Sequence, residues 1–268
     1  MSAPVSITWW GHATTTIALN GRRVLTDPVL TRRLAHLSRI GGPLPGTDAL
    51  RADVALVSHL HFDHLDVPSL RRLSRGTRIV APHGAVRALS RSAPDVAHRI
   101  EEVVPDDSVN LNGVRIRAVP AKHDGRRSPL SRFSGPALGF IIENDDVEVP
   151  TRIWFAGDTG LFAAMTQLAP IDVAVVPVGG WGPSLGPTHL DPEQAAEAVR
   201  RVGAGDAIPI HYGTLWPYGL RHVHPASFRR GFADPGTKFA AELARALPSA
   251  MAHVISHGQT VTIQGPGS

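Results

Sequence analysis

A short segment of the chain concentrates side chains that bind metal ions. Three histidines and one aspartate, at positions 59, 61, 63 and 64, lie within the sequence His59-Leu60-His61-Phe62-Asp63-His64. Imidazole nitrogen and carboxylate oxygen are ligands that Zn²⁺ and other borderline divalent ions accept. The segment follows residues 54–57, an apolar run typical of a strand buried on both faces. The pattern therefore predicts a metal-binding loop at the end of a central strand.

Three more candidate ligands occupy similar places later in the chain. His123, Asp158 and His211 each come just after a predicted strand. Side chains that leave the ends of neighbouring strands at one edge of a sheet can converge there. Several strand ends that each bring His or Asp to one edge predict a binuclear metal site. The three strands concerned are predicted over residues 114–119, 152–156 and 207–210.

The order of the predicted elements favours a layered α/β (α+β) structure. The chain opens with strands, and Asn20-Gly21 between two of them is a strong hairpin signal. Two strand-rich halves with helices outside them predict a four-layer αββα sandwich. Strands are predicted over 7–10, 14–19, 23–26, 54–57, 78–81, 137–143, 172–176 and 261–263 as well. Helices are predicted over 66–73, with Asp66 as the N-cap, and over 161–168, 192–202 and 237–246.

Composition narrows the class of protein. The 268 residues are 43% hydrophobic and 19% charged, which suits a globular chain and predicts one domain over residues 1–268. No apolar run approaches the roughly 18 residues needed to span a bilayer, and the N-terminus shows no signal-peptide pattern. The absence of cysteine excludes disulfides, thiolate ligands and cysteine nucleophiles. We therefore expect a cytoplasmic protein without stable membrane insertion.

The basic side chains do not indicate a nucleic-acid-binding protein. The net charge is +4, and almost all of the basic residues are arginines that are scattered along the chain in pairs. Nucleic-acid binders usually gather their basic residues on one face or stripe. Scattered pairs favour a solvated surface, so we do not expect nucleic acid as a partner.

The ordered motifs resemble those of the metallo-β-lactamase superfamily. The matching parts are the His-x-His-x-Asp-His loop at 59–64, His123, Gly157-Asp158-Thr159 and Ile210-His211-Tyr212-Gly213. The resemblance implies the αββα metallo-β-lactamase sandwich with two divalent metal ions, Zn²⁺ in the first place and Mn²⁺ or Fe²⁺ as alternatives. It implies one ion held by His59, His61 and His123, a second held by Asp63, His64 and His211, and Asp158 bridging the two.

Within that superfamily the chain is similar to the branch that contains N-acylphosphatidylethanolamine phospholipase D and the ascorbate-6-phosphate lactonase type. The segment Gly186–Ala195 resembles that branch's His-x-[Asn/Asp]-Pro-Glu motif, in which the histidine, here His189, lies near the metals and contacts the substrate. Further similar segments are Trp10–Thr14, Leu25–Pro28, Lys122-His123 with Arg126-Arg127, and Phe155–Gly160.

The resemblance implies a binuclear metal-dependent hydrolase, first of all a phospholipase-D-like phosphodiesterase that uses a hydroxide between the two metals. Asp63 would orient this nucleophile, and His189 would stabilise the substrate oxyanion or protonate the leaving group. The alternative enzyme is a lactonase that acts on a sugar-phosphate or acyl lactone. A third hypothesis is a metal-binding scaffold without catalytic activity. We expect a small-molecule or lipid phosphodiester or lactone as substrate, and self-association stays open.

For several residues the sequence leaves two possible roles open. His12 and Asp27 either hydrogen-bond a metal ligand or only shape the local turn and packing. Arg126 and Arg127 either bind a phosphate group or belong to a solvated loop. Four loop residues either line a substrate pocket or pack within their loops: Trp181, Trp216, Tyr218 and Leu220.

Overall fold

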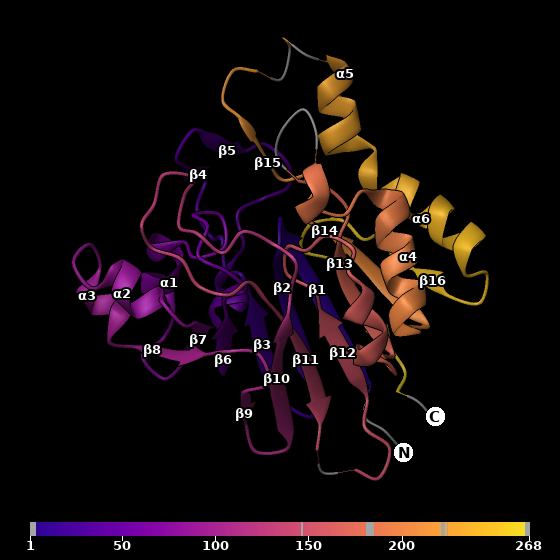
Figure 1. Cartoon of the computed structure of the whole chain (residues 1–268), viewed down its shortest axis with the longest axis horizontal. Coiled ribbons are helices and arrows are strands. Elements are labelled where there is room, and N and C mark those ends of the chain that lie inside the picture. The colour runs from indigo at the N-terminus through magenta and orange to yellow at the C-terminus, as the bar shows by residue number, and fades with distance from the viewer. Residues whose placement is uncertain (1–3, 146, 181–184, 221–222, 224, 266–268) are drawn as a thin grey trace.

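Two seven-stranded β-sheets and one small three-stranded sheet form the framework, as seen in a computed structural model that describes residues 4–145, 147–180, 185–220, 223 and 225–265 (Figure 1). The first large sheet combines the N-terminal strands with the last strand described. In spatial order it consists of β17 (Thr260–Ile263), β1 (Val5–Gly11), β2 (Thr14–Leu19), β3 (Arg22–Thr26), β6 (Val54–Leu56), β7 (Arg78–Pro82) and β8 (Ile100–Val103).

The second large sheet comes from the later part of the chain. Its spatial order is β16 (Met251–Ala252), β14 (Asp206–Ile210), β13 (Val173–Pro177), β12 (Arg152–Phe155), β11 (Leu138–Asn144), β10 (Val114–Pro120) and β9 (Ser108–Asn110). The small sheet contains β15 (Leu215–Pro217), β5 (Leu37–Arg39) and β4 (Arg33–Leu34).

Helices cover the outer face of each large sheet, on opposite sides of the molecule (Figure 1). The first sheet packs against α1 (Val67–Arg72), α2 (Ala85–Leu89) and α3 (Pro94–Ala97). The second packs against α4 (Pro192–Val202) and α6 (Pro235–Ala246). The order helix, sheet, sheet, helix confirms the predicted four-layer αββα sandwich. Shorter elements are the 3₁₀ turns Thr47–Leu50, Ala163–Leu168 and Gly186–Thr188, α5 (Pro225–Phe228) and the π-helical turn Arg229–Ala233.

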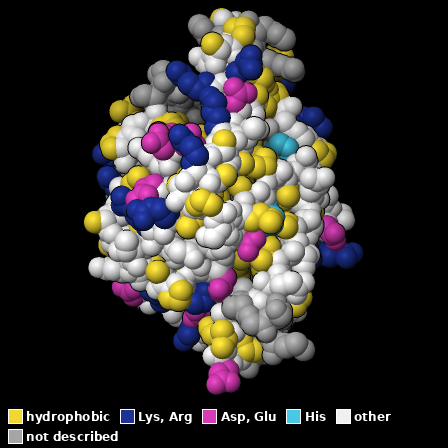
Figure 2. All heavy atoms as spheres, turned by 90° about the vertical axis from the view of Figure 1, so that its right-hand side faces the viewer, with side chains coloured by type: hydrophobic (Ala, Val, Ile, Leu, Met, Phe, Trp, Pro, Cys, Tyr) yellow, Lys and Arg dark blue, Asp and Glu magenta, His cyan; other side chains and the backbone are white. Residues whose placement is uncertain are grey.

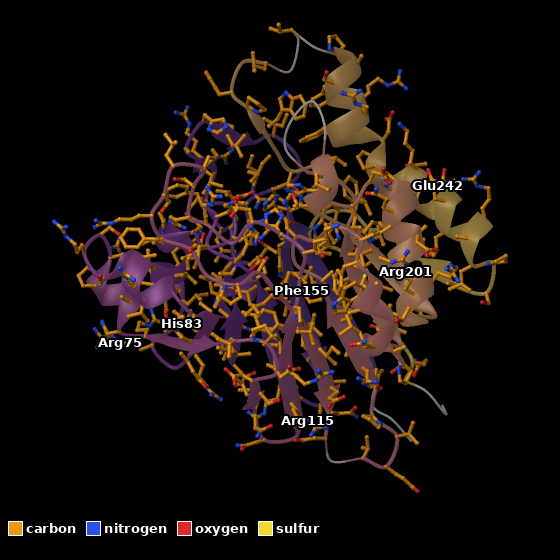
Figure 3. The ribbon with its side chains drawn as sticks, viewed as in Figure 1. Arg75, His83, Arg115, Phe155, Arg201 and Glu242 are labelled. Atoms are coloured by element: carbon orange, nitrogen blue, oxygen red, sulfur yellow. The ribbon has the colours of Figure 1, made fainter. Side chains whose placement is uncertain are left out.

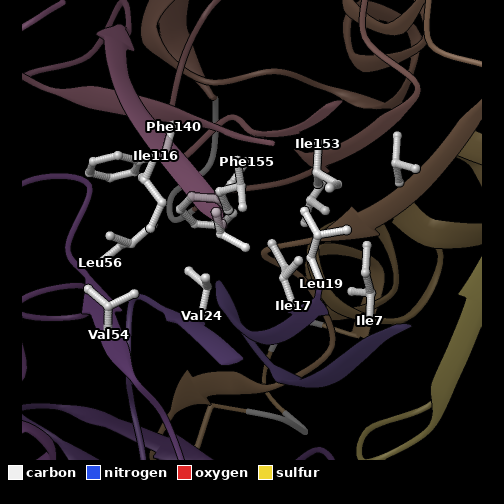
Figure 4. Close-up of a cluster of buried hydrophobic side chains, with 14 of the residues drawn as sticks. Ile7, Ile17, Leu19, Val24, Val54, Leu56, Ile116, Phe140, Ile153 and Phe155 are labelled. Carbon is white, nitrogen blue, oxygen red and sulfur yellow. The ribbon is translucent and has the colours of Figure 1, made fainter. Parts of the chain in front are cut away.

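The largest hydrophobic core lies between the two large sheets (Figure 4). In β1, buried and half-buried residues alternate, which directs Val5, Ile7 and Trp9 into this core. The opposite sheet contributes the fully buried rings of Phe140 and Phe155. Figure 3 shows Phe155 in the middle of the molecule, whereas charged side chains such as Arg115 and Glu242 lie at its periphery. A close-packed interior of this kind holds the two sheets in fixed register and gives the site a rigid support.

Strand direction brings several strand ends to one edge of each sheet. In the first sheet, β1 and β3 each run antiparallel to β2, and β3 runs parallel to β6. In the second, β10 and β12 each run antiparallel to β11, and β12 runs parallel to β13 and β13 to β14. The segments that follow β1, β6, β10, β12 and β14 therefore leave the two sheets in common directions. The segments after β6, β10, β12 and β14 carry the predicted ligands, and the segment after β1 carries His12.

One predicted element was assigned the wrong type. Residues 161–168, predicted as a helix, form an extended stretch and then a 3₁₀ helix over Ala163–Leu168. The segment is helical, but its geometry is the tighter 3₁₀ form, and the apolar pattern of the sequence does not distinguish this form from an α-helix. The predicted helix over 192–202 and the strand over 14–19 match α4 and β2 residue for residue.

Charged side chains on the helix-covered face pair with one another. Basic and acidic side chains are interspersed on the face in Figure 2. On α4, Glu197 lies 2.7 Å from the guanidinium of Arg200 and 2.8 Å from that of Arg201. Exposed pairs of this kind contribute little stability, about 0.3–0.5 kcal/mol each on a helix. Within the described residues, no helix has the length and apolar character needed to cross a membrane.

Candidate metal centre

The histidine-rich segment leaves β6 and folds back over the edge of the sheets as a loop. His64 and Leu65 donate their N–H groups to the carbonyl of His61, at 3.1 and 2.8 Å, which closes a tight turn. His59 and His64 are completely buried, and His61 is half-buried. This turn directs the four predicted ligands of the loop to one place, where residues from the second sheet meet them.

A first cluster consists of three imidazoles. The ligand nitrogens of His59, His61 and His123 all lie within 4.8 Å of one another. His61 Nδ1 lies 2.9 Å from His59 Nε2 and 3.2 Å from His123 Nε2. Burial lowers the pKa of each of the three rings, and the neighbouring histidines lower it further. Neutral imidazoles with facing nitrogens are the form that binds a cation.

Hydrogen bonds at the far sides of the His59 and His123 rings leave their Nε2 lone pairs facing the cluster. The carbonyl of Thr188 lies 2.9 Å from His123 Nδ1, and because a carbonyl only accepts, Nδ1 carries the proton. Ser58 Oγ lies 2.7 Å from Asp27 Oδ2 and 3.0 Å from His59 Nδ1. The serine hydroxyl has one proton, which it donates to the carboxylate, so His59 Nδ1 donates to Ser58. The Nε2 atoms of His59 and His123 are thereby left unprotonated.

A second cluster lies next to the first and contains Asp63, His64, His211 and His12, with one ligand atom of each within 4.8 Å of the others. His12 Nε2 lies 3.1 Å from Asp63 Oδ2. Since an ionised carboxylate only accepts, His12 donates to Asp63. Of the two interpretations of His12, the structure supports a hydrogen bond to a candidate metal ligand. Burial would raise the pKa of Asp63, but His64 and His12 outweigh it and hold the pKa well below its usual value.

Asp158 lies between the two clusters. Its carboxylate is buried, and Oδ2 lies 3.4 Å from His64 Nε2 and 3.2 Å from His211 Nε2. It also groups with His59 and His64 within 4.8 Å, and with His123 and His189 in the same way. Burial would raise the pKa of Asp158, but His211 and His64 lower it well below its usual value. A buried, ionised carboxylate among these five histidines requires cationic partners.

Unpartnered polar atoms test whether a metal fits here. His64 Nε2, Asp158 Oδ1 and both ring nitrogens of His211 are buried without a hydrogen bond within the described part of the chain. A buried polar atom without a partner costs about 1–3 kcal/mol, so several of them in one place are rare. Divalent cations would satisfy the ring nitrogens and the carboxylate together. The donor set and its unpartnered atoms therefore fit two adjacent metal ions.

Asp27 holds one ligand of each cluster. The carboxylate is completely buried and accepts from Ser58 N at 2.7 Å, Ser58 Oγ at 2.7 Å and His64 Nδ1 at 2.6 Å. It therefore orients His64 directly and His59 through Ser58. Burial lowers the pKa of His64, but Asp158 and Asp27 raise it well above its usual value. Of the two interpretations of Asp27, the structure supports the hydrogen bond to a candidate ligand, His64.

Main-chain hydrogen bonds join the two sheets beneath the clusters. His211 N donates to His12 O at 2.9 Å, and Leu138 N donates to Ser58 O at 2.9 Å. His12 and His211 both have positive φ, 52° and 65°, a region that residues other than glycine rarely adopt. Strain of about 1–3 kcal/mol per residue persists where surrounding contacts require it, often at functional sites. The alternation of strand and loop in the sequence carries no signal for this conformation.

His189 lies at the rim of the site. Its Nδ1 donates to the carbonyl of Leu185 at 3.0 Å, and its Nε2 lies 3.6 Å from Asp158 Oδ2. The ring packs edge-on against His123 with centroids 4.7 Å apart, and the side chain is 21% exposed. His189 just precedes α4, whose N-terminus is fixed by a capping box between Asp191 and Gln194. The structure thus brings His189 within reach of a molecule bound beside Asp158.

Arg127 has a role that neither sequence reading described. Its Nη1 donates to the carbonyls of Leu60 and Leu65, both at 2.8 Å, so it clamps the histidine loop. Burial lowers the pKa of this guanidinium to about 10. Arg126 is exposed and lies 3.4 Å from Asp124 Oδ1, as expected for a solvated loop. The carbonyls that Arg127 contacts are far apart from it in sequence, so only the folded chain reveals the clamp.

A groove opens beside the site, and its walls differ from the predicted ones. It has a volume of about 380 Å³ and is lined mainly by the β4–β5 segment 34–37, by His61–Asp63 and by residues 127–129. Trp216 instead lines a much smaller cavity of about 20 Å³ together with His12 and His211. Tyr218 and Leu220 are exposed, and Trp181 lies outside the described residues. The short strands of the β4–β5 hairpin carry no periodic signal, so the groove escaped prediction.

The chain matches the family model of the beta-lactamase superfamily domain over residues 22–212. Among curated proteins it is 32% identical to a UPF0173 metal-dependent hydrolase of Thermococcus onnurineus, over 80% of this chain and 86% of that protein. It is 30% identical to N-acyl-phosphatidylethanolamine-hydrolyzing phospholipase D 1 of Caenorhabditis elegans, over 81% of this chain and 66% of that protein.

Other comparisons define how far the similarity extends. An uncharacterized protein of Mycobacterium tuberculosis is 30% identical over 79% of this chain, but the match spans only 59% of that protein's length. Among solved structures, the metallo hydrolase Igni18 of Ignicoccus hospitalis superposes with a TM-score of 0.71 and 24% identity, over 98% of this chain and 99% of that one. This chain therefore belongs to the metallo-β-lactamase superfamily of metal-dependent hydrolases.

Proposed function

We propose that the protein is a binuclear metal-dependent phosphodiesterase of the phospholipase-D-like type. The observation that carries this proposal is the position of Asp158, a buried carboxylate with His64 Nε2 and His211 Nε2 at 3.4 and 3.2 Å and an unpartnered second oxygen. A carboxylate between two groups of imidazoles suits a pair of adjacent cations. In this proposal the residues fold as a single domain, and Zn²⁺ is the first candidate for the metal.

The proposed ligand sets follow the two clusters. His59, His61 and His123 would hold one ion, and Asp63, His64 and His211 the other, with Asp158 shared. The unprotonated Nε2 atoms of His59 and His123 and the unpartnered nitrogens of His64 and His211 support this assignment. Divalent ions held in this way supply Lewis acidity and lower the pKa of water at the site.

The protein's own groups would orient and protonate the reactants. Asp63 accepts a hydrogen bond from His12 on Oδ2, which fixes the carboxylate and leaves Oδ1 to accept from an attacking water. His189 is held through Nδ1 by the carbonyl of Leu185, so Nε2 is the atom that faces the site. In the imidazolium form, with both ring nitrogens protonated, Nε2 would donate a hydrogen bond or a proton to a substrate oxygen. These two residues are the proposed catalytic groups besides the ligands.

The choice of a phosphodiester rests on similarity to the nematode protein, whose name describes hydrolysis of N-acyl-phosphatidylethanolamine. The test combines metal analysis with turnover of bis(p-nitrophenyl) phosphate, for wild type and Asp158→Asn. We expect about two ions per chain in the wild type and loss of at least one ion and of turnover in the variant. One ion or none in the wild type, or turnover indifferent to Asp158, would contradict the proposal.

A matched control and a second substrate sharpen this test. Asp172 accepts from Arg152 N at 2.7 Å, a bond that an asparagine oxygen can replace. Asp172→Asn should therefore keep both metal content and turnover. If the protein opens acyl or sugar lactones but hydrolyses no diester, the phosphodiesterase assignment is wrong and the protein is a lactonase.

A further inference from the structure

The groove beside the metal centre has an apolar lining that continues into the site. Leu34 and Leu37 lie on one wall, Phe62 and Pro129 contribute to it from the other loops, and His61 and Asp63 connect it to the two clusters. Leu34 and Leu37 are each only 7% exposed, so they lie deep in the groove. A molecule that reacts at the clusters can therefore place a neighbouring group on these apolar side chains without leaving the site.

Phe62 is an exposed aromatic residue with a fixed position. Its side chain is 49% exposed, although a phenyl ring gains about 1.5–3 kcal/mol when it is buried. The guanidinium carbon of Arg127 lies 3.9 Å from the ring centroid, and Arg127 is itself held by two loop carbonyls. A cation over one face of the ring restrains it. The Phe62 ring is thus held in place at the groove, where it stays partly exposed instead of packing into the hydrophobic core.

We propose that this groove is the specificity site for an aryl group or a compact apolar group next to the bond that is hydrolysed, with Phe62 as the specificity-determining residue. The inference rests on the proposed function and narrows its substrate class. Phosphodiesters with an aromatic or branched apolar substituent would be preferred over diesters with small or strongly polar substituents. Arg127 acts as a positioning residue, because it holds the Phe62 ring and the loop that carries it.

The dimensions favour part of a small molecule as the occupant. The volume of about 380 Å³ lies within the range of about 300–1,000 Å³ for small-molecule sites. A protein partner needs a surface of about 800 Å² on each side, and deep-lying leucines such as Leu34 are poorly placed for it. The groove also opens directly at His61 and Asp63, so its occupant lies beside the reacting bond.

Binding of phosphonates measures the preference without turnover. Isothermal calorimetry on the metal-loaded protein would compare phenylphosphonate with methylphosphonate, and octylphosphonate would show whether a flexible chain fits equally well. We expect phenylphosphonate to bind roughly tenfold more tightly than methylphosphonate, as for partial burial of a ring. Equal dissociation constants, or binding of neither compound, would overturn the inference. A preference for the octyl compound alone would also overturn it, because a long chain would then be the occupant.

Substitutions at Phe62 locate the effect. Phe62→Ser should remove most of the preference for the phenyl compound, and Phe62→Leu should retain part of it. Leu130 is fully exposed on the neighbouring loop and does not line the groove, so Leu130→Ser is the matched control and should keep the preference. Metal content and thermal unfolding of each variant show that loop and fold are intact. A preference that survives Phe62→Ser would refute the assignment of Phe62.

The two proposals fail in different ways. Turnover of bis(p-nitrophenyl) phosphate without any preference for phenylphosphonate would leave the phosphodiesterase standing and refute the specificity groove. A phenyl preference that depends on Phe62, in a protein that hydrolyses no diester, would support the groove and refute the phosphodiesterase.

Discussion

Replacing Asp27 with asparagine should weaken metal binding at both clusters. One oxygen of Asp27 accepts from Ser58 N, and the other accepts from both Ser58 Oγ and His64 Nδ1. The asparagine oxygen can keep the first bond, but its NH₂ group cannot accept the other two. Hydrogen bonds to a charged acceptor contribute about 1.5–3 kcal/mol each, so losing two sets an upper limit of about 6 kcal/mol before the site relaxes.

The measurable effect is smaller, because the metal-facing nitrogens stay in place. Loss of a carboxylate behind a ligand histidine typically costs about 10–100-fold in metal affinity. The assay is competition between the metal-free protein and a chromophoric chelator for Zn²⁺, with the stoichiometry resolved. Asp27→Asn should weaken both binding steps, whereas Ser58→Ala should weaken mainly the step assigned to His59. Wild-type affinity at both steps in Asp27→Asn would refute the reasoning.

Three further predictions concern pH, metal uptake and a helix end. Burial lowers the pKa of His257 to about 4, below its ordinary 6.5, so the free energy of unfolding should fall as the pH drops from 6.5 to 4. In urea titrations, the free energy of unfolding of His257→Gln should depend less on pH over this interval. Metal uptake should release protons and tighten as the pH rises, because the carboxylates around His64 raise its pKa well above the usual value; a pH-stat titration with Zn²⁺ measures this release. Gly203 ends α4 with φ 74°, so Gly203→Ala should cost about 1 kcal/mol, while Gly205→Ala, which has open space and no positive φ, should be near neutral in urea unfolding.

Local signals explain why the layered fold could be predicted. The hairpin at Asn20-Gly21 has φ values of 50° and 72°, the conformation that this residue pair favours. Helix α4 begins at a capping box and ends at a left-handed glycine, both readable from the sequence. The candidate ligands were recognisable for a similar reason, since each follows a segment whose pattern predicts a strand. In these places neighbouring residues determine the structure.

Pairing between distant residues explains what the sequence did not reveal. Strand β5 pairs with β15, with Leu215 opposite Arg39, although the two strands are far apart in the chain. Strands of two or three residues carry too little pattern to be predicted. The clamp by Arg127 and the contacts of Asp27 also depend on segments that meet only after folding. The groove walls and the Arg127 clamp were therefore beyond sequence reasoning, whereas the hydrogen bonds of His12 and Asp27 to candidate ligands were one of two interpretations that the sequence left open.

The main-chain bonds beneath the site have a consequence for how the protein can change. The bonds from His211 N to His12 O and from Leu138 N to Ser58 O do not depend on which side chains these residues carry. Mutations that exchange ligands, tune metal preference or reshape the groove can therefore accumulate while the backbone frame keeps its geometry. Because main-chain bonds support the fold and side chains carry the chemistry, substitutions can change the reaction without first disrupting the fold.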